Sequence, residues 1–264
     1  MKLAPRSVIA VAMSAVLLSA TTFAQDQVTE TASASTEALQ NNNSTNEAPF
    51  NDAQMAALEE IIHSYIVTHP EVLVEAAQMM ELRRQVEQRL KVEDLAQELV
   101  KNEQIPVRFG DENSKHHVIE FFDYNCGYCK SSRAIVEQFA KENNVKVHYM
   151  EFPVLSELSV EASLIGTALF LEDPDKYFVY QDFLMNRPEK LDSRETIKEA
   201  VKKAKGDWDK LAEAAKDPKV QKLIGSNIEK GRSIGVSGVP FFIVDGKVLR
   251  GAITSVDNFK ELIK

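Results

Sequence analysis

The two cysteines of this chain stand three residues apart, as Cys126-Gly127-Tyr128-Cys129, where a strand-like run meets a helix-like run. Residues 117–122 before them are rich in β-branched and aromatic side chains, and residues 131–141 after them have apolar residues at helical spacing. In a helix's first turn such a pair can close a small disulfide ring, and the unpaired N–H groups there favour a thiolate at Cys126. Because a thiolate attacks disulfides and a thiol does not, the spacing predicts a redox-active dithiol.

Two other interpretations of the cysteine pair are less favoured. A structural zinc site needs four ligands, but there is no second cysteine pair, and adjacent His116 and His117 should point to opposite faces of a strand. A purely structural disulfide across so short a loop would remove little chain entropy. We therefore expect no metal and no cofactor other than the Cys126–Cys129 disulfide.

The amino terminus has the pattern of a secretory signal. Lys2 and Arg6 provide the charged region, residues 8–18 are apolar, and Thr22-Phe23-Ala24 resembles a cleavage site. The apolar stretch is shorter than the roughly 20 residues that span a bilayer. Residues 1–24 are therefore predicted to be a signal peptide, and export would place the dithiol where disulfides are made and kept.

The charge balance excludes some partners. The chain has a formal charge of −9, which becomes −11 without the signal peptide, because Lys2 and Arg6 are the only charged residues removed. A protein this acidic should avoid nucleic acid and anionic lipid.

Residues 25–48 are rich in Ser, Thr, Asn and Gln with few large apolar residues, so we predict a disordered linker there.

Residues 49–105 are predicted to form a helical module. Asn51 and Gln54 fit a capping box at the start of a first helix, and Pro70 fits the first turn of a second helix that runs to Leu99. These helices are too small to form a core alone, so their apolar stripes must pack against the rest of the chain or against other subunits. We favour a homodimer or homotrimer over internal docking. The apolar stripe of the first helix consists of Met55, Leu58, Ile62 and Tyr65, and that of the second helix consists of Leu82, Val86 and Leu90.

The rest of the chain alternates between strand and helix patterns. Residues 145–152 are predicted to form a strand parallel to 117–122. The predicted elements that follow are helices at 160–171, 176–185, 194–204 and 220–234, strands at 241–244 and 247–250 joined by an Asp245-Gly246 turn, and a closing helix at 255–263.

This order of elements resembles an α/β thioredoxin fold with the helical insertion of the DsbA family. The matching residues are Glu120-Phe121-Phe122 with Cys126 and Cys129, and the segment 235–247, which contains Gly-Val-Pro and Asp-Gly. The resemblance implies a thioredoxin domain at 106–264 with its insertion at about 156–234. Pro70-Glu71-Val72-Leu73 is similar to the oligomerising amino-terminal module of ScsC-type proteins.

The resemblance also implies roles for individual residues. Pro240 should be cis and face the cysteines; a cis bond before proline costs only about 0.5–1 kcal/mol more than trans. Glu120 should lie buried under the disulfide, where its pKa is raised and it relays protons to Cys129. The residues expected to contact substrate are Gly127, Tyr128 and Val239.

The chain departs from the strongly oxidising DsbA proteins between its cysteines. Gly127-Tyr128 stands where those proteins have Pro-His, so Cys126 lacks one cationic stabiliser. We therefore expect a less oxidising disulfide that is better suited to reversible shuffling.

The predicted function is that of an exported, periplasmic thiol-disulfide oxidoreductase that forms or isomerises disulfides. Its expected partners are unfolded or misoxidised secreted proteins and a membrane redox partner that reoxidises or reduces it. The alternative is a Cu(I)-binding protein, since paired thiolates hold Cu(I) and ScsC-type proteins are linked to copper tolerance. A structural adaptor is a third possibility, but the joint presence of Glu120, both cysteines and Val239-Pro240 argues against it.

Overall fold

The computed structural model describes residues 50–263, so the predicted signal peptide, 1–24, and the predicted linker, 25–48, lie outside the described residues. The chain divides into two compact units between Val72 and Leu73. Among the described residues, no helix is long and apolar enough to cross a membrane.

The first unit contains helix α2, Asp52–Thr68. The Asn51 side chain accepts a hydrogen bond from the Gln54 N–H at 2.9 Å, and the Gln54 side chain accepts one from the Asn51 N–H at 3.0 Å. The predicted capping box is therefore confirmed. No α2 residue is buried. The predicted apolar stripe is thus exposed along its length, at Met55, Leu58, Ile62 and Tyr65.

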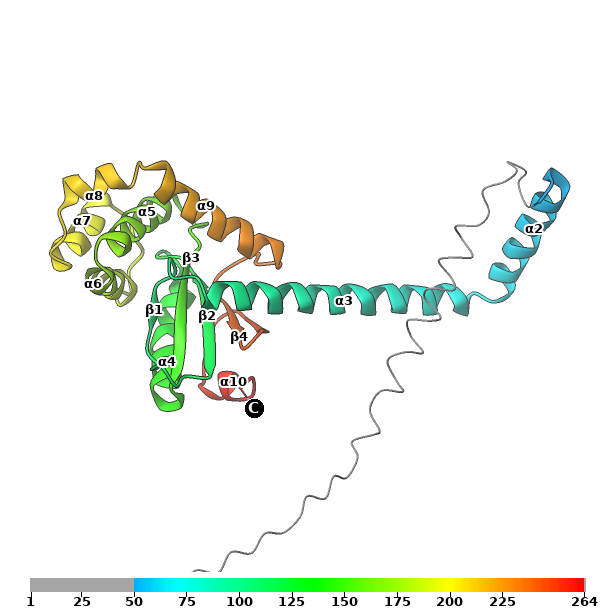
Figure 1. The fold of residues 1–264 in the computed structure, drawn as a ribbon, viewed down its shortest axis with the longest axis horizontal. Coiled ribbons are helices and arrows are strands. Elements are labelled where there is room, and N and C mark those ends of the chain that lie inside the picture. Colours follow the sequence, from blue (N-terminus) through cyan, green and yellow to red (C-terminus); the bar gives the residue numbers. More distant parts are fainter. Residues whose placement is uncertain (1–49, 264) are drawn as a thin grey trace, which may run out of the picture. The chain divides into compact units, whose positions relative to one another are not determined.

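The second unit contains a mixture of strands and helices (Figure 1). In chain order its elements are α3 Glu71–Val100, β1 Val107–Arg108, β2 His116–Phe122, α4 Gly127–Asn143, β3 Val145–Glu151, α5 Glu157–Glu172, α6 Pro174–Met185, α7 Arg194–Lys203, α8 Trp208–Ala214, α9 Pro218–Ser233, β4 Phe241–Val244, β5 Lys247–Arg250 and α10 Asp257–Lys260. Every predicted strand and helix is present. Two elements, β1 and α8, are additions to the prediction.

The last helix is shorter than predicted. The Ser255 hydroxyl accepts a hydrogen bond from the Asp257 N–H at 3.1 Å and also donates to the Asp257 carboxylate. These local bonds favour a non-helical backbone at Ser255, so α10 begins only at Asp257. It also ends three residues before the predicted end, at Lys260, and residues 261–262 form a turn.

The strands within residues 50–263 form a five-stranded sheet with the order β1-β3-β2-β4-β5. Strands β2 and β3 are parallel, as predicted, and α4 forms the crossover between them. The remaining neighbours pair antiparallel. With helices on both faces and the insertion α5–α9 between β3 and β4, this is the thioredoxin-like fold with a helical insertion that the sequence predicts.

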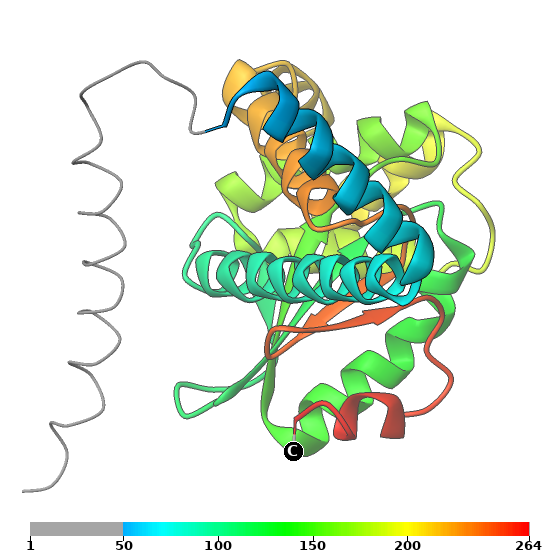
Figure 2. The ribbon, with the colours of Figure 1, turned by 90° about the vertical axis from the view of Figure 1, so that its right-hand side faces the viewer.

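The alternation of β2 divides the buried core between the two faces of the sheet. Val118 and Phe122 pack with the buried residues of α4 and of the insertion. Ile119 and Phe121 face the other way and pack with α3 and with Ile234, which follows α9. Helix α10 lies beside α4 (Figure 2), where the Phe259 and Phe139 rings stack at 4.9 Å.

The carboxyl-terminal half of α3 belongs to this sheet domain. Its buried residues are Val92, Leu95, Ala96 and Leu99. The Gln88 side chain donates a hydrogen bond to the Ile234 carbonyl at 2.6 Å, and Lys230 pairs with Glu98 at 2.5 Å. The compact unit therefore starts well before residue 106, where the sequence pattern places the thioredoxin domain. The α3 stripe of Leu82, Val86 and Leu90 is exposed.

Candidate redox-active site

Cys126 and Cys129 form a disulfide at the amino end of α4, with their Cα atoms 5.2 Å apart. Cys126 is the N-cap residue of this helix, and its Sγ accepts a hydrogen bond from the Cys129 N–H at 3.0 Å. Cys129 has no exposed surface, whereas Cys126 retains 4%. In the reduced protein the same N–H and the helix dipole would stabilise a thiolate at Cys126.

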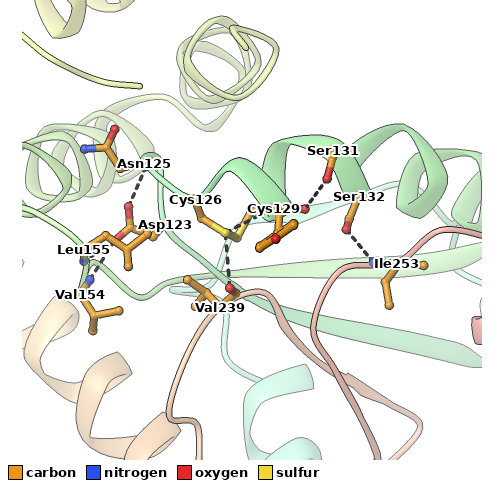
Figure 3. Close-up of a disulfide and its surroundings, with 11 residues drawn as sticks. Asp123, Asn125, Cys126, Cys129, Ser131, Ser132, Val154, Leu155, Val239 and Ile253 are labelled. Atoms are coloured by element: carbon orange, nitrogen blue, oxygen red, sulfur yellow. Dashed lines mark hydrogen bonds between the residues drawn. A yellow bond between two sulfur atoms is a disulfide. The ribbon is translucent and has the colours of Figure 1, made fainter. Parts of the chain in front are cut away.

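The loop before β4 faces the disulfide. The Val239–Pro240 peptide bond is cis, as the resemblance implies. The Val239 carbonyl oxygen lies 3.4 Å from Cys126 Sγ (Figure 3). On the α4 side, Gly127 and Tyr128 are exposed, and the Tyr128 side chain is 69% accessible. The residues expected to contact substrate therefore surround the Cys126 sulfur or project from the same helix turn.

Glu120 lies at the centre of the sheet, between Tyr149 of β3 and Phe242 of β4. It is buried and shares its face of β2 with Phe122, which packs in the same core as both cysteines. The predicted inward orientation is confirmed. Burial raises the pKa of Glu120 to about 7; the Arg133 charge acts to lower this pKa, and Glu137 acts to raise it.

We expect Glu120→Gln to stabilise the protein only at high pH. The pKa of Glu120 is about 7 in the folded protein and 4.5 as its ordinary value, so folding favours the protonated form. Its contribution to stability is present below pH 4.5 and is lost as the pH rises through 7. Chemical unfolding should show a gain of about 2–3 kcal/mol for Glu120→Gln at pH 8. No gain is expected at pH 4.5 or for the exposed Glu112→Gln; equal gains at both pH values would contradict this account.

Asp123, which the sequence did not suggest, fixes a loop beside the disulfide. It is fully buried just after β2. One carboxylate oxygen accepts a hydrogen bond from the Asn125 N–H at 2.7 Å, and the other accepts from the Val154 and Leu155 N–H groups at 2.8 and 2.9 Å (Figure 3). Since the side chains of Val154 and Leu155 are exposed, Asp123 presents an apolar loop near Cys126.

Asn125 fixes a second loop in the same way. Its Nδ2 donates hydrogen bonds to the Ser156 hydroxyl at 2.6 Å and to the Leu191 carbonyl at 3.2 Å, and its Oδ1 accepts from the Leu191 N–H at 2.5 Å. The two polar side chains that flank Tyr124, just before Cys126, were the available sequence signal. Asp123 and Asn125 join the segment before Cys126 to the residues that precede α5 and, through Asn125, to Leu191 after α6.

Glu151, at the end of β3, is a second buried acid that the sequence did not suggest. Its carboxylate accepts hydrogen bonds from Tyr124 at 2.7 Å, Tyr177 at 3.0 Å and Ser163 at 2.7 Å. Burial raises the pKa of Glu151 to about 7, and these three hydrogen bonds limit the rise. A Cβ atom on Gly166 would lie 3.3 Å from the carboxylate, so this position favours glycine. The cluster ties the insertion to the sheet.

The histidines considered as zinc ligands have separate partners. His116 Nδ1 lies 2.6 Å from an Asp245 carboxylate oxygen, and His117 Nδ1 lies 2.9 Å from His148 Nε2. Within residues 50–263, no group of three or more His, Cys, Asp and Glu side chains is arranged to hold a metal ion.

Two family models match the chain. Residues 101–264 match the model described as "Thioredoxin", and residues 54–87 match the model described as "Copper resistance protein ScsC N-terminal domain". The "Probable disulfide bond formation protein D" of Bacillus cereus is 21% identical over 166 residues, which cover 58% of this chain and 75% of that protein.

Solved structures agree with these matches. The thiol-disulfide exchange protein alpha-DsbA2 of Wolbachia pipientis is 25% identical, with a TM-score of 0.60 over 68% of this chain and 95% of that one. A periplasmic thioredoxin-like protein of Salmonella enterica serovar Typhimurium is 26% identical, with a TM-score of 0.57 over 64% and 93%.

A third structure extends into the amino-terminal helices. A linker-deletion mutant of Proteus mirabilis ScsC covers 83% of this chain and 99% of its own, with a TM-score of 0.59 and 24% identity, and shows a shared fold. The thioredoxin model alone matches more than half of the chain. The chain therefore belongs to the thioredoxin family, as a DsbA-like thiol-disulfide oxidoreductase with a CXXC pair and a ScsC amino-terminal domain.

Proposed function

We propose that this protein is a periplasmic enzyme that forms and isomerises disulfides in secreted proteins, with Cys126 as its nucleophile. One observation supports this most strongly. The Cys126 sulfur accepts an N–H hydrogen bond at the start of α4 and lies against the Val239 carbonyl, whereas Cys129 is fully enclosed. The attacking sulfur is thus the one that a polypeptide reaches.

The exchange proceeds in two balanced steps. The Cys126 thiolate attacks one sulfur of a substrate disulfide, so that a mixed disulfide forms and the other substrate sulfur leaves as a thiolate. The Cys129 thiolate then attacks Cys126 Sγ, which releases the second substrate thiolate and forms the Cys126–Cys129 disulfide. The substrate gains two electrons and the enzyme loses two. When substrate thiols attack the oxidised enzyme, the same steps run in reverse.

Glu120 is proposed to handle the proton at Cys129. This thiol must lose a proton before it attacks and regain one when it leaves, and its burial excludes bulk water. A carboxyl group with a pKa near neutrality is suited to both transfers.

The loop at Val239-Pro240 is proposed to hold the substrate chain. Because the Val239 carbonyl faces Cys126 Sγ, an extended segment with its cysteine bonded to Cys126 is able to pair with this backbone. Gly127 and Tyr128, which directly follow Cys126, provide exposed surface at the start of α4.

The amino-terminal helices are proposed to assemble the protein as a homodimer or homotrimer. The exposed stripes of α2 and α3 and the ScsC-domain match at residues 54–87 support this. Several dithiols on one particle would raise the local thiolate concentration, which favours isomerisation of wrongly paired substrates.

The reduction potential of the Cys126–Cys129 pair tests the proposed direction. With Gly127-Tyr128 between the cysteines, we expect a value between those of thioredoxin, about −270 mV, and DsbA, about −120 mV. Equilibration with a glutathione buffer, followed by thiol trapping, would measure it. The same protein should refold a scrambled disulfide substrate. A thioredoxin-like potential without isomerase activity would indicate a reductase instead.

Cu(I) binding is a second candidate function, because the family model that matches residues 54–87 is that of a copper resistance protein. Two thiolates whose Cα atoms lie 5.2 Å apart in the oxidised form suit a soft monovalent ion. Titration of the reduced protein with Cu(I) against a competing chelator would test this, with Cys126→Ser as the control that must lose the site.

A further inference from the structure

A cleft of about 470 Å³ opens beside the attacking cysteine. It lies between the first turns of α4 and the segment that follows α6. Gly127, which directly follows Cys126, and Arg187 both line it. Apart from its chain neighbours and the α4 backbone, no atom lies within 4 Å of the position that a Cβ on Gly127 would occupy, so the cleft is open there.

The two acidic residues of the cleft already have cationic partners. Asp182 accepts hydrogen bonds from Arg108, at 2.6 Å, and from Arg133. Glu137 lies 3.2 Å from Arg133 Nε. Glu137 also lies 3.3 Å from Lys141 Nζ, so both carboxylates that line the cleft are already paired with cations.

Lys130 is a cation that lines this cleft. It forms no ion pair with a carboxylate of residues 50–263; its Nζ donates a hydrogen bond to the Glu189 carbonyl at 2.5 Å. Burial lowers the pKa of Lys130 and the nearby Arg187 charge lowers it further, whereas the Glu189 and Asp123 carboxylates act to raise it. Arg187 itself has only a distant partner, Glu199 at 3.7 Å. Lys130 and Arg187 therefore bring two positive charges to this part of the cleft against one nearby exposed carboxylate, Glu189, although the chain as a whole has a charge of −9.

The helix geometry directs this charge toward the reacting sulfur. The Lys130 N–H donates to the Cys126 carbonyl at 3.1 Å, so Lys130 stands one helical turn after Cys126 on the same side of α4. Side chains in a helix lean toward its amino end, which brings the Lys130 stem back over Gly127. A molecule bonded to Cys126 would lie within reach of this ammonium group.

We propose that Lys130 and Arg187 form a carboxylate-binding subsite that selects acidic partners for the disulfide chemistry of Cys126. This inference rests on the proposed function and adds a substrate class to it. The carboxylate has two possible sources: an acidic residue next to a protein cysteine, or a small acidic thiol of the glutathione type. Both place a negative charge a few bonds from the sulfur that Cys126 attacks.

Exchange kinetics with matched substrates test the subsite. One arm uses peptide disulfides that differ only in Asp, Asn or Lys beside the cysteine, and the other compares glutathione disulfide with its esterified form. At low ionic strength, where the Debye length is about 30 Å, we expect kcat/KM to be roughly five- to tenfold higher for the acidic member. Lys130→Gln should reduce the ratio to below about twofold, as should about 1 M salt.

Lys203→Gln is the matched control. It removes the same charge from an exposed position in the last turn of α7, which does not line the cleft, and should keep the full preference. A preference in the peptide arm alone assigns the subsite to polypeptides, and one in the glutathione arm alone assigns it to small thiols. No preference in either arm, or one that survives Lys130→Gln, overturns the inference. If instead the parent protein exchanges with none of these disulfides, the proposed function itself fails.

Discussion

Replacing Cys126 with serine is expected to reduce thiol-disulfide exchange to the background rate, because a hydroxyl group at neutral pH supplies no comparable nucleophile. Cys126 is the only cysteine with exposed surface, and its sulfur accepts the Cys129 N–H hydrogen bond that would stabilise a thiolate. Reduction of a model disulfide substrate, followed by fluorescence, would measure the loss.

The companion change, Cys129→Ala, should have a different result. Cys126 still attacks, but the enclosed second sulfur is no longer present to release the substrate. Turnover then falls while mixed disulfides accumulate, and they can be seen as higher bands on a non-reducing gel. Substantial turnover by Cys126→Ser, or mixed disulfides formed by that variant, would contradict the assigned roles.

The second large effect concerns α3. Deletion of residues 25–100 should abolish cooperative folding, because it removes Val92, Leu95, Ala96 and Leu99 from the core on one face of the sheet. Loss of one buried leucine side chain costs about 2–5 kcal/mol, and a whole domain is stable by only about 5–15 kcal/mol. Thermal unfolding followed by circular dichroism would test this.

Deletion of residues 25–72 is the matched control, since it stops at the boundary between the two compact units. We expect a folded protein that exchanges disulfides, assembles less than its parent by light scattering because only the α3 stripe remains, and isomerises scrambled substrates poorly. A full-length protein that is already monomeric, or a truncated one that isomerises as well as its parent, would overturn the proposed assembly and its purpose. A cooperative transition after the longer deletion would contradict the role of α3.

The parts of this site that the sequence predicts depend on short-range patterns. The three-residue spacing of the cysteines, the alternation that turns Glu120 inward and the Asp245-Gly246 turn are each readable within a few residues. The resemblance added the cis bond at Pro240, which the structure contains.

The missed residues act through contacts between distant parts of the chain. Asp123 binds backbone more than 30 residues away, at Val154 and Leu155, and Asn125 reaches Leu191. A buried acid such as Glu151 looks like any strand-end glutamate until its hydroxyl partners are known. The same limit applies to α3: its buried and exposed apolar residues have similar helical spacing, so the sequence does not distinguish the half that packs on the sheet.

The order in which the two cysteines react tests the central claim most directly. The reduced protein would be treated with a limiting amount of an alkylating agent, and the modified cysteine identified by peptide mass spectrometry at several times. Our account predicts that Cys126 is modified first and that Cys129 stays largely unmodified, because the former has the exposed sulfur and the helix-start N–H. Faster modification of Cys129 would show that the roles of the nucleophile and the resolving cysteine are reversed.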